Sequence, residues 1–180
     1  MKAIGFIETS SVARGIVCCD AMLKAAPVEL VYARQTCPGR FTVLVTGDVG
    51  SVEASVAAAE AEGHGTMIDS CLIPNLDDRV MAAIGGAGDV REGDALGIVE
   101  TYSLASGFVA ADAAVKAADV TAVELRLGGG MSGKAYVLLA GDLSLVQAAV
   151  AAAKKAVEAD GMLDQVAVVP SPAPALRSVI

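Results

Sequence analysis

The sequence predicts an α+β protein made of two tandem ferredoxin-like domains, each with the element order β-α-β-β-α-β. An internal repeat is the first observation behind this prediction: residues 3–9 read Ala-Ile-Gly-Phe-Ile-Glu-Thr and residues 95–101 read Ala-Leu-Gly-Ile-Val-Glu-Thr. From residue 3 to residue 28, 14 of the 26 positions that pair at this offset of 92 are identical. Further along the chain the offset becomes 94, which pairs Gly47-Asp48 with Gly141-Asp142. We therefore expect a first domain at residues 1–90 and a second at residues 91–180.

The elements of the first copy follow from apolar periodicity and from capping residues. Residues 3–8 read as a strand, and the Thr and Ser residues at positions 9–11 cap a helix. Pro27 ends this helix, because proline lacks the amide proton that a helix interior requires. Asp48 caps a second helix that runs towards Gly63. The apolar faces of these helices are expected to be Val12, Ile16, Cys19 and Leu23 in the first and Val49, Val52, Val56 and Ala59 in the second.

The other elements are placed in the same way. The remaining strands of the first copy are expected at residues 28–34, 41–46 and 66–73. In the second copy, the same patterns predict strands at 95–100, 120–127, 135–140 and 163–169, and helices at 103–117 and 142–159. Residues 75–94 are expected to form a short apolar turn and a linker that contains Gly85-Gly86-Ala87-Gly88.

Composition and charge exclude several classes of protein. Apolar residues make up 54% of the chain, yet charged or glycine residues interrupt every long apolar run, so we expect neither a membrane span nor a secretory signal. We therefore expect a cytosolic protein. The net charge of −8 argues against a nucleic-acid partner, since no Lys/Arg cluster could neutralise a row of phosphates. Only 19% of residues are charged, which indicates that the protein buries part of its surface by self-association.

One of the four cysteines lies where a thiol is accessible. Cys37 precedes Pro38 and Gly39 in a turn between two strand-like runs. Proline biases the residue before it towards an extended backbone, and glycine permits the reversal that follows, so this thiol is expected on a loop tip. The corresponding loop of the second copy, residues 127–134, has no cysteine. The other three cysteines, Cys18, Cys19 and Cys71, are expected to pack as small apolar residues.

The repeated motifs resemble those of a known family. Ala-Ile/Leu-Gly-x-Ile/Val-Glu-Thr, the helix sequence at residues 20–26 and Gly47-Asp48-Val49 are similar to motifs of bacterial microcompartment (BMC) shell proteins. Two fused copies imply the tandem-domain subclass, whose trimers form a pseudo-hexagonal tile. The resemblance implies a location in the microcompartment shell in the cytoplasm, with other shell proteins as partners and encapsulated redox enzymes as further candidates.

The cysteine turn resembles that of the iron–sulfur shell proteins of propanediol-utilisation compartments. This resemblance implies one 4Fe-4S cluster per homotrimer, held by Cys37 of three chains, with electron transport across the shell as its role. Three thiolates would leave the fourth iron with a non-protein ligand or an open position. Zinc held by three thiolates and water is an alternative. The resemblance further implies a pore at the three-fold axis, lined by Cys37, Pro38, Gly39, Gly128, Gly129, Gly130 and Met131.

Lys24 and Lys116 occupy the same place in both copies, near the end of the first helix. A cation there interacts favourably with the helix dipole, by about 0.3–1 kcal/mol. The resemblance implies a second role for both lysines, in which they lie at tile edges and pack against neighbouring trimers.

The sequence offers no catalytic constellation. His64 has no nearby carboxylate cluster, and we interpret Glu8 and Glu100 as structural hydrogen-bonding groups rather than catalytic acids. Gly128–Gly130 lacks the Lys-Ser/Thr pair of a phosphate-binding loop, so we do not expect an enzyme. Two alternatives remain open beside the cluster-binding shell protein. One is a cofactor-free trimer whose pore conducts metabolites, and the other is a regulatory trimer that binds a nucleotide.

Overall fold

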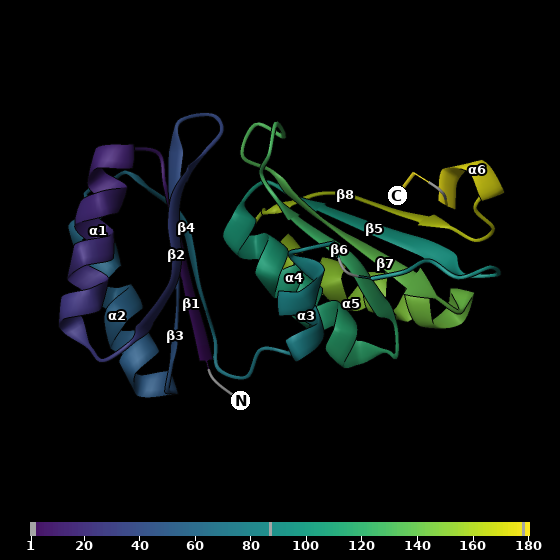
Figure 1. Ribbon diagram of the computed structural model, residues 1–180, viewed down its shortest axis with the longest axis horizontal. Coiled ribbons are helices and arrows are strands. Elements are labelled where there is room, and N and C mark those ends of the chain that lie inside the picture. Colours follow the sequence, from purple (N-terminus) through teal and green to yellow (C-terminus); the bar gives the residue numbers. More distant parts are fainter. Residues whose placement is uncertain (1–2, 87, 178) are drawn as a thin grey trace. The chain divides into compact units, whose positions relative to one another are not determined.

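The computed structural model describes residues 3–86, 88–177 and 179–180, which form two compact units (Figure 1). The first unit contains the described residues up to Leu76, together with the segments Ser103–Ser106 and Gly128–Gly133. The second unit contains the other described residues from Asp77 onwards.

The first unit is an antiparallel sheet with two helices on one face. Its sheet has the strand order β2-β3-β1-β4, and Figure 1 shows α1 and α2 on the same side of it. Ser11 is the N-cap of α1, and Asp48 caps α2 by accepting a hydrogen bond from the Ser51 backbone N–H. The elements are β1 (Ala3–Thr9), α1 (Val12–Ala25), β2 (Glu29–Thr36), β3 (Arg40–Gly47), α2 (Val49–Glu62) and β4 (Met67–Ile73).

The second unit repeats this topology, with the strand order β6-β7-β5-β8. Its elements are α3 (Asp78–Ala83), β5 (Ala95–Thr101), α4 (Leu104–Ala117), β6 (Thr121–Leu127), β7 (Ala135–Gly141), α5 (Leu143–Glu158), β8 (Leu163–Val169) and α6 (Pro174–Arg177). The first three residues of α4 belong to the first unit. The matching strand orders confirm the predicted α+β class and the duplication.

Glycines set how closely the helices approach the sheets. A Cβ atom placed on Gly5 of β1 would lie 2.7 Å from side-chain carbons of both Val52 and Val56 on α2. The equivalent Gly97 of β5 is 2.7 Å from Val150 and 2.8 Å from Val146 by the same measure. The same close contact therefore occurs in both copies, and no larger residue fits there without a shift of the helix.

The predicted apolar face of α1 is wrong for three of its four residues, and only Cys19 is buried as expected. Val12, Ile16 and Leu23 are 37%, 55% and 41% exposed, whereas the buried residues of α1 are Gly15, Cys18, Cys19 and Met22. The reason is the close approach at Gly15, where a Cβ would lie 2.5 Å from Phe41 of β3. The face with the smallest residue turns towards the sheet, and the larger aliphatic residues are left outside. In α2 the predicted residues Val52, Val56 and Ala59 are buried, while Val49 is 43% exposed.

Two short helices occur in addition to the elements expected from the sequence. Residues 78–83, expected as part of an apolar turn, form α3, with Asp77 as its N-cap. Residues 174–177 form α6. Ala87 of the predicted glycine-rich linker lies outside the described residues. No helix in the described part of the chain has the length and apolar character needed to cross a membrane.

Candidate functional site

The β2–β3 loop presents the cysteine turn to solvent. Thr36 and Arg40 are paired at the end of the β2–β3 ladder, and Cys37, Pro38 and Gly39 form the turn between them. All three turn residues are exposed. Gly39 has a positive φ of 83°, and a Cβ placed there would meet no atom within 4 Å. Cys37 therefore lies on a loop tip, as predicted.

The other three cysteines are buried, which confirms their predicted packing role. Cys18 donates a hydrogen bond from Sγ to the Ala59 carbonyl oxygen, at 3.4 Å. Burial raises the pKa of the Cys18 thiol and also the pKa of the Cys19 thiol. Because a metal ligand must be a thiolate, these two groups are poor candidates for coordination.

One chain alone does not supply a metal centre within its described residues. Over residues 3–86, 88–177 and 179–180, no group of three or more His, Cys, Asp or Glu side chains converges to hold a metal ion. Cys37 is the exposed cysteine of the chain. Any cluster at the β2–β3 loop would therefore need thiolates from several copies of the chain.

The Gly128–Gly133 segment packs against the two ends of the β2–β3 loop, within the first unit. A Cβ placed on Gly128 would lie 2.4 Å from Thr36 Oγ1, and one placed on Gly133 would lie 2.1 Å from the Arg40 guanidinium carbon. Gly128, Gly129 and Gly130 all have φ values between 77° and 90°, which favour glycine. The residues predicted to line a pore thus lie on two adjacent loops, with Met131 half-buried between its exposed neighbours Gly130 and Ser132.

Beneath these loops, Glu8 lies at the centre of a buried polar network. Its side chain is fully buried and accepts a hydrogen bond from Arg40 Nη1 at 2.7 Å and another from the Leu104 backbone N–H at 2.9 Å. Arg40 Nη1 also donates to the Gly133 carbonyl oxygen at 2.7 Å. Burial raises the pKa of Glu8, and the hydrogen bond from Arg40 partly opposes that shift. The role expected for Glu8 from the sequence, a structural hydrogen-bonding group, is confirmed.

Asp69 of β4 forms a second contact with the start of α4. Its carboxylate accepts hydrogen bonds from the hydroxyl groups of Ser103 and Ser106, the latter at 2.7 Å. Ser103 Oγ also accepts from the Ser106 backbone N–H at 3.0 Å, which is the geometry of a helix cap. Sequence reasoning missed Arg40, Asp69 and both serines. The available signal was the pair of serines three residues apart at a helix start.

The two predicted tile-edge lysines have different surroundings. Lys24 Nζ lies 2.5 Å from Asp20 Oδ2, with both side chains well exposed. Lys116 Nζ lies 2.6 Å from Asp112 Oδ2, but Asp112 is buried and also accepts a hydrogen bond from the Asp77 backbone N–H at 2.9 Å. The edge role of both lysines remains a prediction.

Comparison with known proteins identifies relatives over nearly the whole chain. A family model described as BMC domain matches residues 3–76 and again 95–172. The bacterial microcompartment shell protein PduT of Citrobacter freundii is 40% identical over 171 residues, covering 95% of this chain and 93% of PduT. The microcompartment shell protein EutM of Salmonella typhimurium is 40% identical over 76 residues, covering 41% of this chain and 79% of EutM.

Solved structures agree with these matches. The crystal structure of a microcompartment protein from Desulfitobacterium hafniense is 43% identical, with a TM-score of 0.85 and 99% of each chain covered. A fused permuted hexameric shell protein is 23% identical, with a TM-score of 0.69 over 88% of this chain and 84% of that one. At that identity the second structure supports the fold alone.

Proposed function

The chain belongs to the BMC-domain family and is a structural shell protein of a bacterial microcompartment, and on that premise we propose that three copies form a pseudo-hexagonal tile with Cys37 at its axis. Two domains in each chain give six domains in a closed ring of three, so such a trimer would fill the place of a hexagonal tile. The near full-length similarity to PduT supports a tandem-domain tile that assembles with other shell proteins. Its relatives are shell components rather than enzymes.

We further propose that the tile binds one 4Fe-4S cluster through Cys37 of the three chains. The donor set fits this cofactor, because each copy contributes one exposed thiol on a loop tip and a three-fold axis brings three such loops together. When bound, the cluster would gain and lose one electron, which suits electron transfer between a redox enzyme inside the shell and an electron carrier outside it.

The loops around Cys37 suit this role. Gly39 adds no side chain to the loop tip, and Gly128–Gly130 carry none that could fill the proposed axis. Their backbone N–H groups could donate to the sulfur atoms of a cluster, an interaction that tunes its potential. Arg40 holds the Gly133 end of the neighbouring loop in place through its hydrogen bond to the carbonyl oxygen.

The observation that carries the proposal is that Cys37 is exposed, whereas the other three cysteines are buried. We would purify the protein anaerobically and measure iron, acid-labile sulfide and the EPR spectrum after reduction. The expected result is close to four iron and four sulfide per trimer. Cys37→Ser should lose both, and Cys19→Ala is the matched control that should keep both.

The same assay distinguishes the cluster from a plain pore. Trimers of the wild-type protein that contain no iron would overturn the cofactor proposal and support the cofactor-free tile that conducts metabolites. Three thiolates with one zinc and no sulfide would instead indicate the zinc alternative.

We also propose that Lys24 lies at the tile edge. Its side chain is 74% exposed, so its charge can meet a neighbouring tile. Lys24→Asp should leave the trimer intact in solution but abolish extended sheets in electron micrographs. Sheets of normal extent in this variant would contradict the assignment of Lys24 to the tile edge.

A further inference from the structure

The residues that form the contact between Glu8 and the start of α4 have equivalents in the other copy of the repeat, and these equivalents, all among the described residues, do not contact each other within the chain. Glu8, Arg40 and Asp69, which we call the first rim, hold the helix start made of Ser103, Leu104 and Ser106. The first rim comes from the first copy of the repeat, and the helix start comes from the second. The contact is therefore of the head-to-tail kind, in which each copy carries one half of two different surfaces.

The repeat places a second rim and a second helix start in the chain. Glu100 occupies the position of Glu8, and strand pairing puts Lys134 at the position of Arg40 and Gln165 at that of Asp69. At the offset of 92, the second helix start corresponds to Ser103, Leu104 and Ser106 and consists of Ser11, Val12 and Arg14.

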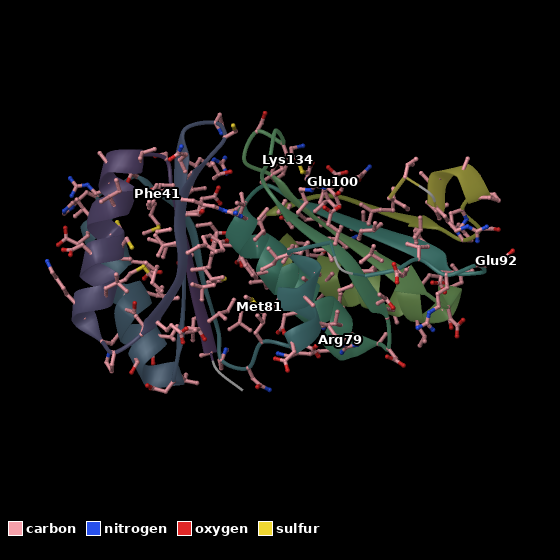
Figure 2. All side chains as sticks on the ribbon, in the orientation of Figure 1. Phe41, Arg79, Met81, Glu92, Glu100 and Lys134 are labelled. Carbon is pink, nitrogen blue, oxygen red and sulfur yellow. The ribbon has the colours of Figure 1, made fainter. Side chains whose placement is uncertain are left out.

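The second rim is accessible. Glu100 is half-buried and Gln165 is exposed. No hydrogen bond to the Glu100 carboxylate is found within the described part of the chain. Lys134 attracts it electrostatically, but Lys134 Nζ pairs with Asp164 Oδ2 at 2.5 Å. Figure 2 shows Glu100 and Lys134 at the same end of the second unit. The second rim, which corresponds to Glu8 and Arg40, is thus present, but it does not bind the start of a helix as the first rim does.

The second helix start has the complementary chemistry. Val12 is the first residue of α1, so its backbone N–H has no acceptor within the helix, and its side chain is 37% exposed. Arg14 adds a positive charge where the first contact has Ser106, and its nearest carboxylate oxygen, on Glu62, is 3.9 Å away. A carboxylate is favoured at this site by the helix dipole and by the guanidinium.

We infer that Glu100 of one copy caps α1 of a second copy, accepting a hydrogen bond from the Val12 backbone N–H beside Arg14. This inference rests on the proposed trimer and names the residues that close it. The partner is a second copy of this chain, because the first rim already holds the equivalent helix start in the same way. In the proposed trimer this contact would recur at each of the three junctions between chains.

The test measures assembly, using sedimentation velocity over a range of protein concentrations. Glu100→Gln should raise the dissociation constant for adding a copy about 10- to 100-fold, as expected for a hydrogen bond to a charged group. Glu92→Gln is the matched control: this glutamate is exposed in the loop before β5, and the variant should assemble like the wild type. Circular dichroism checks that each variant keeps its fold.

A charge swap identifies the pairing itself. Glu100→Arg and Arg14→Glu should each weaken assembly, and the double variant should recover only the part that comes from the charge pair, because arginine cannot accept the hydrogen bond from the Val12 N–H. A wild-type trimer whose dissociation constant is unchanged in Glu100→Gln, or a double variant weaker than both single ones, would overturn this contact and leave the proposed trimer standing. Wild-type protein that stays monomeric at every concentration would overturn both.

Discussion

In the first copy of the repeat, the glutamate near the end of the leading strand is fully buried and both of its carboxylate oxygens accept hydrogen bonds. In the second copy, Glu100 is half-buried, and the neighbouring cation Lys134 pairs with Asp164 and lies 5.5 Å from the centre of the Tyr102 ring. The hydrogen bond from Lys134 lowers the pKa of Asp164. Duplication thus preserved the backbone, while the polar groups at equivalent ends came to serve different contacts.

The sharpest test of this difference is Glu8→Ala. Removing the carboxylate leaves the Leu104 N–H without its acceptor and the Arg40 guanidinium without its carboxylate partner, so we expect a loss of about 3–5 kcal/mol in the free energy of unfolding. Glu100→Ala should cost the isolated monomer less than about 1 kcal/mol. Urea denaturation at a concentration where the chain is monomeric measures both, and equal losses would contradict the contrast between the copies.

The glycines of the leading strands should behave alike in the two copies. Gly5→Ala and Gly97→Ala each bring a Cβ to 2.7 Å from valine side chains of the covering helix. Overpacking of this kind costs about 1–3 kcal/mol, and we expect the two losses to agree within about 1 kcal/mol. Thermal unfolding of the two variants provides the measurement. A large effect in one copy alone would show that the helix–sheet spacing has diverged as well.

The aspartate–lysine pairs in the first helix of each copy should contribute differently to the free energy of unfolding. Asp112→Ala removes an acceptor from the Asp77 N–H and from Lys116 at a buried position, which we expect to cost about 1–3 kcal/mol. Asp20→Ala removes only an exposed pair with Lys24, worth less than about 0.5 kcal/mol. Chemical denaturation of the two variants in parallel decides whether the buried contact matters.

The smallest expected effect concerns the short helices that follow the two sheets. Asp77 caps α3, and its hydrogen bond from the Arg79 side chain lowers its pKa to about 2 from an ordinary value of 3.8. A lowered pKa means that the folded state binds its proton less readily, so this stabilisation is present above about pH 4 and is lost as the pH falls towards 2. Residue 173, which precedes α6, is alanine and offers no such cap.

Asp77→Asn should therefore lower the melting temperature near neutral pH and flatten its decline between pH 4 and pH 2. The measurement is a series of thermal melts across that range, with wild-type protein alongside. A variant whose melting temperature falls as steeply as that of the wild type would show that other carboxylates dominate acid unfolding.

Much of the fold could be predicted from the sequence, because its signals are local. The repeat, the Pro27 stop and the Asp48 cap act through neighbouring residues, and each prediction is confirmed. The resemblance to microcompartment shell proteins is confirmed by the BMC-domain match and by PduT. The buried face of α1 could not be predicted from aliphatic residues, since the contact at Gly15 depends on Phe41, 26 positions away in the chain.

The candidate site also has a part that the sequence predicted and a part that it did not. The sequence by itself determined that a thiol stands on a turn between two strands, because Pro38 and Gly39 restrict the backbone locally. Only the tertiary structure decided that Arg40 and Leu104 meet on Glu8, and that Gly128 and Gly133 lie against the ends of the cysteine loop. Those contacts join residues 32 to 96 positions apart, so they depend on how the chain packs and not on any local preference.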